Sequence, residues 1–298
     1  MRRFLPVILL AILSSSCGIV RFGSSELFTA GPAIRSDYAP QGIVEERICP
    51  CSVPGPTQRR LIAYLPADYY TSGKNYPVIY LLHGARGYET SWIRFGEVYH
   101  TADSLWAKGK AAPCIIIMPN VNQYNDDRDY GDSRFKNAFE SIFEVDGIVE
   151  SAFMDDVVGY VDSVYRTIPD KAHRAIAGIS IGAYQAIYFG TNYPDAFDYF
   201  GIMSPYMWSL GHPGITRHRF FSHMRSRMKV QFQDPPKGYY LYAGTWDMAR
   251  PSTERLDRFM TRKGYPHTYT IYPESHDWPT GWKEEFKDFF QHAFKEPY

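Results

Sequence analysis

The stretch RAIAGISIGAYQA, residues 174–186, decides the fold class of this 298-residue chain. Its first residues are small and apolar, as in a short buried strand, and the segment after GISIG (residues 178–182) has a helical pattern. A G-x-S-x-G between a strand and a helix predicts a sharp turn that strains the serine backbone, and the flanking glycines avoid clashes there. Ser180 is therefore expected at a helix N-terminus with its hydroxyl exposed, as a candidate nucleophile.

Strand-like and helix-like stretches alternate along most of the chain. Apolar runs predict strands at residues 60–65, 76–82, 113–118, 175–177, 199–203, 239–243 and 268–272. Amphipathic stretches predict helices at residues 154–167, 181–193, 252–262 and 283–294. This alternation predicts an α/β domain over residues 42–298, with a mostly parallel sheet covered on both faces. Residues 210–236 interrupt the alternation and are interpreted as a cap or insertion over the site.

A serine nucleophile needs a base, and the base needs a carboxylate that orients it. In the order that follows a G-x-S-x-G serine, the acid comes first and the histidine second. Asp247 follows the strand predicted at residues 239–243, and His276 follows the strand predicted at residues 268–272. Carboxyl ends of parallel strands are where such sheets place catalytic groups. We predict His276 as the base and Asp247 as its partner; Asp277, adjacent to the histidine, is the lesser candidate.

Chemistry at a carbonyl also needs N–H donors for the oxyanion. Ile181, directly after the serine, is the first predicted donor. The second is expected in the turn after residues 76–82, where Ala85 is preferred and Gly84 is the alternative. A purely structural turn is the competing interpretation. His83, in the same turn, is predicted to brace the loop and is also a candidate substrate-binding residue.

These segments together resemble one esterase family, which contains feruloyl and acetyl-xylan esterases, esterase D, enterobactin esterases and the antigen 85 mycolyltransferases. The resemblance covers residues 60–294 and is carried by YLLHG (80–84), the 174–186 stretch, the turn at 244–247 and SHDWPTGW (275–282). It implies the α/β-hydrolase fold and a serine esterase activity. The chain has Ala183 where the family usually has a second glycine, and fewer glycines after YLLHG, which affects loop shape and not the reacting groups.

Charge and context narrow the substrate class. The chain has 32 basic and 32 acidic residues, so no bulk field would recruit nucleic acid or an acidic membrane surface. The resemblance, together with the export that residues 1–16 predict, favours feruloyl or acetyl esters on plant-type polysaccharides or oligosaccharides. Trp246 and Trp278, beside the predicted acid and base, are candidate pocket residues, with packing as the competing role. The alternatives are a siderophore or lipid esterase, an acyltransferase, and a catalytically silent carbohydrate-binding lipoprotein.

The N-terminus predicts export. Residues 1–16 combine two arginines, an apolar run at 4–13 and small residues before Cys17. The apolar run is shorter than the roughly 20 residues that a membrane span needs. The pattern resembles a bacterial lipoprotein signal, so Cys17 is predicted to be lipidated and residues 17–41 to form a tether. Plain secretion is the alternative, and the only membrane contact expected is through this anchor.

The remaining cysteines and acidic residues do not predict a metal site. Cys49, Cys51 and Cys114 allow one disulfide with one thiol left over, or simple packing. The acidic loop at residues 125–132 fails the EF-hand spacing because Tyr130 occupies the glycine position. The chain has no P-loop, HExxH or dinucleotide motif, so no cofactor is expected.

Overall fold

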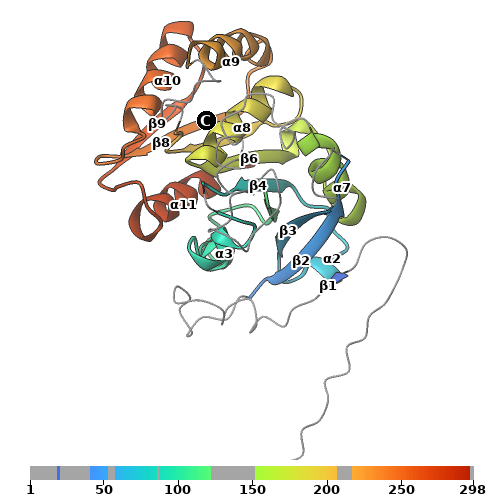
Figure 1. Ribbon diagram of the computed structural model, residues 1–298. Helices are drawn as coiled ribbons and strands as arrows, with labels where there is room; N and C mark the ends of the chain where they lie inside the picture. The colour runs from blue at the N-terminus through green and yellow to red at the C-terminus, as the bar shows by residue number, and fades with distance from the viewer. Residues whose placement is uncertain are drawn as a thin grey trace, which may run out of the picture.

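The computed structural model describes residues 19–20, 41–52, 58–85, 87–121, 152–206 and 217–295. The described strands form one nine-stranded sheet in the order β1-β2-β3-β5-β4-β6-β7-β8-β9 (Figure 1). Strands β1 to β3 pair antiparallel, and β3 joins β5 antiparallel, whereas every pair from β5 to β9 is parallel. The strand bounds are β1 (Ile19–Val20), β2 (Ile43–Pro50), β3 (Gln58–Leu65), β4 (Val78–Leu82), β5 (Ile115–Pro119), β6 (Arg174–Ile179), β7 (Tyr199–Met203), β8 (Gly238–Gly244) and β9 (Thr268–Tyr272).

Each predicted strand is present, and β7 and β9 have the predicted bounds. The sequence interpretation missed β2, whose polar residues resemble a loop. The sheet accommodates these residues because Arg47 donates to Glu45 at 2.7 Å, so two buried charges compensate each other. Two residues of the predicted tether form β1, which pairs with Glu46 and Arg47 of β2.

Helices cover both faces of the sheet, as predicted from the alternation. Figure 1 shows α8, α9 and α10 on one side and α3 and α11 on the other. One buried cluster packs below η1, α7, α8, α9 and α10, and a second packs below α3, α4 and α11. The helix bounds are α2 (Tyr69–Ser72), α3 (Ser91–Arg94), α4 (Val98–Ala107), η1 (Phe153–Gly159), α7 (Tyr160–Val164), η2 (Lys171–His173), α8 (Ile181–Asn192), α9 (Arg217–Gln231), α10 (Arg250–Lys263), η3 (Trp278–Trp282) and α11 (Lys283–His292).

The predicted cap region divides into two parts. Residues 210–216 of the predicted region lie outside the described residues. Helix α9 takes up most of the remainder, and its Met224 and Met228 are buried in the same cluster as α8 and α10. The described part therefore covers the sheet in the same way as the neighbouring helices.

The three cysteines within the described residues are free thiols. Cys49 and Cys114 are fully buried in different clusters, on opposite faces of the sheet. Burial raises the pKa of the Cys49 thiol to about 12. Packing is therefore the role that the structure assigns to Cys49 and Cys114, and Cys51 is partly exposed.

No helix in the described part of the chain has the length and apolarity to cross a bilayer.

Candidate active site

The predicted nucleophile, acid and base meet at one edge of the sheet. Ser180 follows β6, Asp247 follows β8 and His276 follows β9. Because β6 to β9 are parallel neighbours, their carboxyl ends lie side by side. The fold thus brings together residues that are up to 96 positions apart in the sequence.

The backbone at Ser180 has the strained conformation that the G-x-S-x-G motif predicts. Its φ is 53° and its ψ is −112°, a region that a residue with a side chain seldom adopts. A Cβ on Gly178 would lie 2.5 Å from the carbonyl carbon of Gly182, and a Cβ on Gly182 would lie 2.4 Å from the His83 carbonyl oxygen. Both glycines are therefore required for the turn that presents the serine.

A hydrogen-bonded chain links the three side chains. The Ser180 hydroxyl lies 3.1 Å from His276 Nε2, and His276 Nδ1 lies 2.8 Å from Asp247 Oδ1. When His276 Nδ1 carries the proton and donates it to Asp247, Nε2 is left without a hydrogen and can accept the serine proton. The lesser candidate, Asp277, instead accepts a hydrogen bond from Ser275 at 2.8 Å.

Asp247 is held by more than the imidazole. Its Oδ1 also accepts from the Ala249 N–H at 2.6 Å, and its Oδ2 accepts from the Ser204 hydroxyl. Burial alone would raise the pKa of Asp247, but the contacts with His276, Ser204 and Ala249 outweigh burial and lower the pKa below its ordinary value. The group is therefore an ionised acceptor at neutral pH.

Aromatic rings fix the orientation of the imidazole. The ring of His276 meets that of Trp282 edge to face, with centroids 4.9 Å apart. Trp282 packs against Trp278 at 5.1 Å, and Trp278 packs against Trp92 at 4.9 Å. Such pairs restrict ring rotation. The contacts described for Trp278 are thus packing contacts, the role that competed with substrate binding in the sequence analysis. Trp246, in contrast, is 72% exposed.

The predicted oxyanion donors lie on both sides of the serine. Ile181 is the first residue of α8, and N–H groups of a first helical turn have no partner within the helix. Gly84 is next to the nucleophile, since a Cβ on it would be 3.5 Å from Ser180 Cβ. The turn through Ala85, which is exposed, is closed by the Gly87 N–H donating to the Gly84 carbonyl at 3.0 Å.

The contacts of His83 are those expected of a residue that braces the loop, and its buried ring does not face an open surface as a substrate-binding residue would. The ring is 3% exposed; its Nδ1 lies 2.9 Å from the Gly84 carbonyl and its Nε2 accepts from the Val121 N–H at 3.1 Å. Both nitrogens are therefore occupied by backbone groups. Burial lowers the pKa of His83 to about 4, so the ring is neutral and ties the loop after β4 to the loop after β5.

Sequence reasoning missed Ser204, Trp282 and Glu285. Ser204 directly follows β7, so the rule that located Asp247 and His276 at strand ends could have found it. Glu285 is a carboxyl on the buried side of α11 with Phe286 and Phe289, and an acid within an apolar stripe is a detectable signal. Trp282 has no comparable signal.

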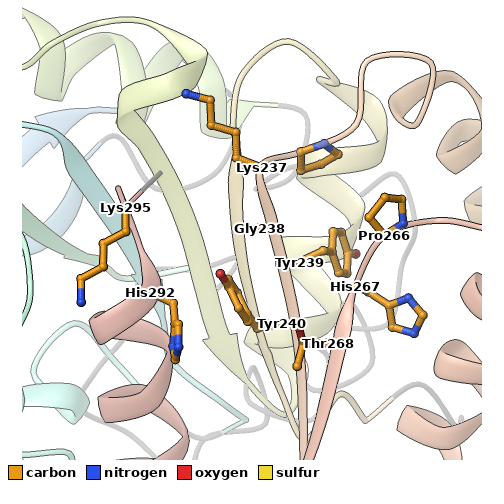
Figure 2. Close-up of a pocket in the computed structure, with 10 residues that line it drawn as sticks. Lys237, Gly238, Tyr239, Tyr240, Pro266, His267, Thr268, His292 and Lys295 are labelled. Atoms are coloured by element: carbon orange, nitrogen blue, oxygen red, sulfur yellow. The ribbon is translucent and has the colours of Figure 1, made fainter. Parts of the chain in front are cut away.

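A separate pocket lies at the opposite edge of the sheet. Figure 2 shows it beside the first residues of β8 and β9, with Lys237, Tyr240, His267, His292 and Lys295 among its lining residues. Its volume is about 310 Å³. Because Ser180, Asp247 and His276 lie at the carboxyl ends of the strands, this pocket is not part of their site.

Within the described ranges, no three His, Cys, Asp or Glu side chains group in a way that could hold a metal ion.

Comparison with known proteins agrees with this geometry. Residues 55–293 match the model of the Esterase family, described as "Putative esterase". The chain is 30% identical over 193 residues to an endo-1,4-beta-xylanase/feruloyl esterase of Xylanibacter ruminicola, covering 63% of this chain and 22% of that protein. It is 27% identical over 206 residues to an esterase of Mycobacterium tuberculosis, and the match covers 67% of this chain and 40% of that protein. The chain thus spans less than half the length of these curated relatives.

Solved structures show the same fold. A ferulic acid esterase from Anaeromyces mucronatus superposes with a TM-score of 0.68 and 21% identity, covering 90% of this chain and 95% of that one. An S-formylglutathione hydrolase from Staphylococcus aureus gives a TM-score of 0.64 and 16% identity, and the match covers 89% of this chain and 100% of that one. These structures confirm the predicted α/β-hydrolase fold. The match to the family model over residues 55–293 confirms the family resemblance: the chain belongs to the Esterase family.

Proposed function

We propose that this protein is a carboxylic ester hydrolase that works through a Ser-His-Asp triad and an acyl-enzyme. The observation that carries the proposal is the hydrogen-bonded chain from Ser180 through His276 to Asp247. The order and the geometry of these three side chains support the roles of nucleophile, base and orienting acid in acyl transfer. Family membership supports the same reaction class.

In the proposed reaction, His276 Nε2 takes the proton of Ser180 as Oγ attacks the ester carbonyl. The resulting imidazolium lies against the ionised Asp247, which stabilises its charge. His276 then protonates the leaving alcohol as the tetrahedral intermediate collapses to the acyl-enzyme. Water, deprotonated by the same histidine, attacks the acyl-enzyme and releases the acid and Ser180.

The oxyanion of each tetrahedral intermediate is proposed to bind the amides of Ile181 and Ala85, with Gly84 as the alternative donor. The position of Ile181 at the start of α8 supports this role, because the helix dipole adds partial positive charge there. A preorganised donor of this kind contributes roughly 3–4 kcal/mol to the barrier reduction.

The proposed substrates are feruloyl or acetyl esters of extracellular polysaccharides. The names of the relatives support a feruloyl group, and the exposed indole of Trp246, directly before Asp247, offers a surface on which a sugar or aromatic acyl ring could stack. Export under the signal at residues 1–16, with Cys17 as a lipid anchor, is proposed from the N-terminal sequence.

The test is hydrolysis of p-nitrophenyl acetate and methyl ferulate by the domain beginning at residue 42 and by its Ser180→Ala variant. We expect turnover that falls by at least roughly a thousandfold in the variant, while ligand affinity is retained. The ratio of the two rates separates small from aromatic acyl groups. Turnover that survives in Ser180→Ala would overturn the mechanism. Binding of feruloylated oligosaccharide without any turnover would instead support the silent-binder alternative.

A further inference from the structure

Ser204 lies between two buried carboxyl groups. Its hydroxyl contacts Asp247 Oδ2. Ser204 Oγ also lies 3.5 Å from Glu285 Oε1, which is a long hydrogen bond. Ser204 is 0% exposed and Glu285 is 1% exposed, so water does not compete for these contacts. The Ser204 backbone has a φ of 51° and is anchored by its N–H donating to the Tyr242 carbonyl at 2.9 Å.

A count of hydrogens limits what this arrangement can be. A serine hydroxyl has one hydrogen to donate, and an ionised carboxylate can only accept. Ser204 therefore cannot donate to Asp247 and Glu285 at once. With both carboxyl groups ionised, two acceptors would share one hydrogen in a dry site, which is costly. A proton on one of the two acids removes this cost, because that acid then donates to Ser204 while Ser204 donates to the other.

The surroundings identify which acid carries the proton. Asp247 accepts from His276, from Ala249 and from Ser204, all of which favour its ionised form. Among the described residues, Glu285 Oε1 has only the Ser204 contact, and its Oε2 has no hydrogen-bond partner.

The charged groups that act on Glu285 are Asp247 and Glu274, both of which are carboxylates. Burial first, and then these two charges, raise the pKa of Glu285 well above its ordinary value and outweigh the Ser204 hydrogen bond, which acts to lower it. Its place in the first turn of α11 favours the anion only weakly by comparison with complete burial of an uncompensated charge.

We propose that Glu285 is a positioning residue that remains a neutral acid and donates its proton to Ser204 Oγ, so that the Ser204 hydrogen is committed to Asp247. The chain of donors then runs from Glu285 to Ser204 to Asp247, while His276 donates to Asp247 from the other side. Only one negative charge is buried behind the imidazole. This inference rests on the proposed triad, because it assigns the groups that hold the triad acid.

The kinetic test compares Glu285→Gln with Glu285→Leu. Glutamine keeps a neutral donor of the same shape, so kcat should stay within about twofold and the acid limb of the kcat/KM pH profile should not move. Leucine removes the donor, and kcat should fall about three- to tenfold, as for loss of one weak buried hydrogen bond. If Glu285 were ionised, glutamine would remove a charge near the imidazole and lower the acid-limb pKa by roughly half a unit or more. That result would overturn the proposal.

A double-mutant cycle separates positioning from packing. If Glu285 acts through Ser204, the effect of Glu285→Leu on kcat should disappear in a Ser204→Ala background. Additive effects in the double variant would show a packing role and reject the inference. Glu284→Gln is the matched control, because Glu284 is next to Glu285 in the sequence but its carboxylate is exposed and contacts Lys287 at 2.9 Å.

A spectroscopic readout needs no turnover. A neutral carboxylic acid has an infrared C=O stretch that ionised carboxylates lack, and this band should be present at pH 8 and absent in Glu285→Gln. Absence of the band from the wild-type protein would overturn the protonation assignment. Because Ser180→Ala tests the nucleophile independently, a failed triad and a failed Glu285 assignment give different results.

Discussion

The Nδ1 atom of His276 lies 2.8 Å from Asp247 Oδ1, across the loops that follow two neighbouring strands. The adjacent carboxyl of Asp277 is occupied by Ser275 instead. Sequence proximity therefore does not select the partner of the imidazole; the register of β8 and β9 does.

Replacing Asp247 by asparagine should lower kcat/KM by roughly a thousandfold or more. An amide N–H facing Nδ1 would favour the tautomer with hydrogen on Nε2, which cannot accept the Ser180 proton. Steady-state hydrolysis of p-nitrophenyl acetate measures the effect. Asp277→Asn is the matched control and should change kcat/KM by less than about threefold. Equal losses in the two variants would contradict the assignment of Asp247.

Gly182→Ala should destabilise the fold by about 1–3 kcal/mol, because the new methyl group would overlap the His83 carbonyl oxygen, 2.4 Å away. Backbone cannot move aside as a flexible side chain can. Gly159→Ala is the control: the nearest atom would be 3.5 Å away and the residue has a helical φ of −60°, so we expect no loss of stability. Urea denaturation compares the two, and equal midpoints would refute the packing argument.

His83 should make the fold sensitive to acid. Its pKa is lowered from 6.5 to about 4 by burial, so between these values the unfolded chain binds a proton that the folded chain does not. The contribution is fully present above pH 6.5 and is lost as the pH falls towards 4, by about 1.4 kcal/mol per unit at most. His83→Gln should flatten this dependence. Parallel pH curves for wild type and His83→Gln would contradict this origin.

Glu285 should make the fold less stable as the pH rises, which is the opposite of the pH dependence expected from His83. Its raised pKa means that the unfolded chain releases a proton above pH 4.5 that the folded chain retains. The contribution to stability is complete below pH 4.5 and declines as the pH rises. The free energy of unfolding of Glu285→Gln should therefore increase relative to that of the wild type by up to about 1.4 kcal/mol per pH unit. Thermal unfolding at pH 4.5, 6 and 8 measures the trend. A constant difference across this range would mean that Glu285 ionises normally in the fold.

The two predicted pocket tryptophans should behave differently. Trp246 is 72% exposed, so Trp246→Ala should leave stability unchanged and raise KM for a feruloylated oligosaccharide several-fold. Trp278 packs on Trp92 and Trp282, so Trp278→Ala should cost about 2–4 kcal/mol of stability. An unchanged KM in Trp246→Ala would remove this residue from the proposed substrate surface.

The fold class and the three residues of the hydrogen-bonded chain could be predicted from the sequence because their signals are local. A G-x-S-x-G between a strand and a helix constrains only adjacent backbone, and the periodicity of β7 and β9 is contained within each strand. The order of acid and histidine, each directly after a strand, then sufficed to place Asp247 and His276 at the carboxyl edge of the sheet.

Only the tertiary structure decided which side chains surround those three. Ser204 meets Asp247 across 43 positions and Glu285 across 81, and no local pattern encodes such contacts. The bracing role of His83 was predicted from the sequence, but its partner Val121 in a neighbouring loop and its near-complete burial follow only from the fold. Sequence patterns specify which elements form, whereas sheet order and burial determine which groups meet, and therefore which of them carry charge.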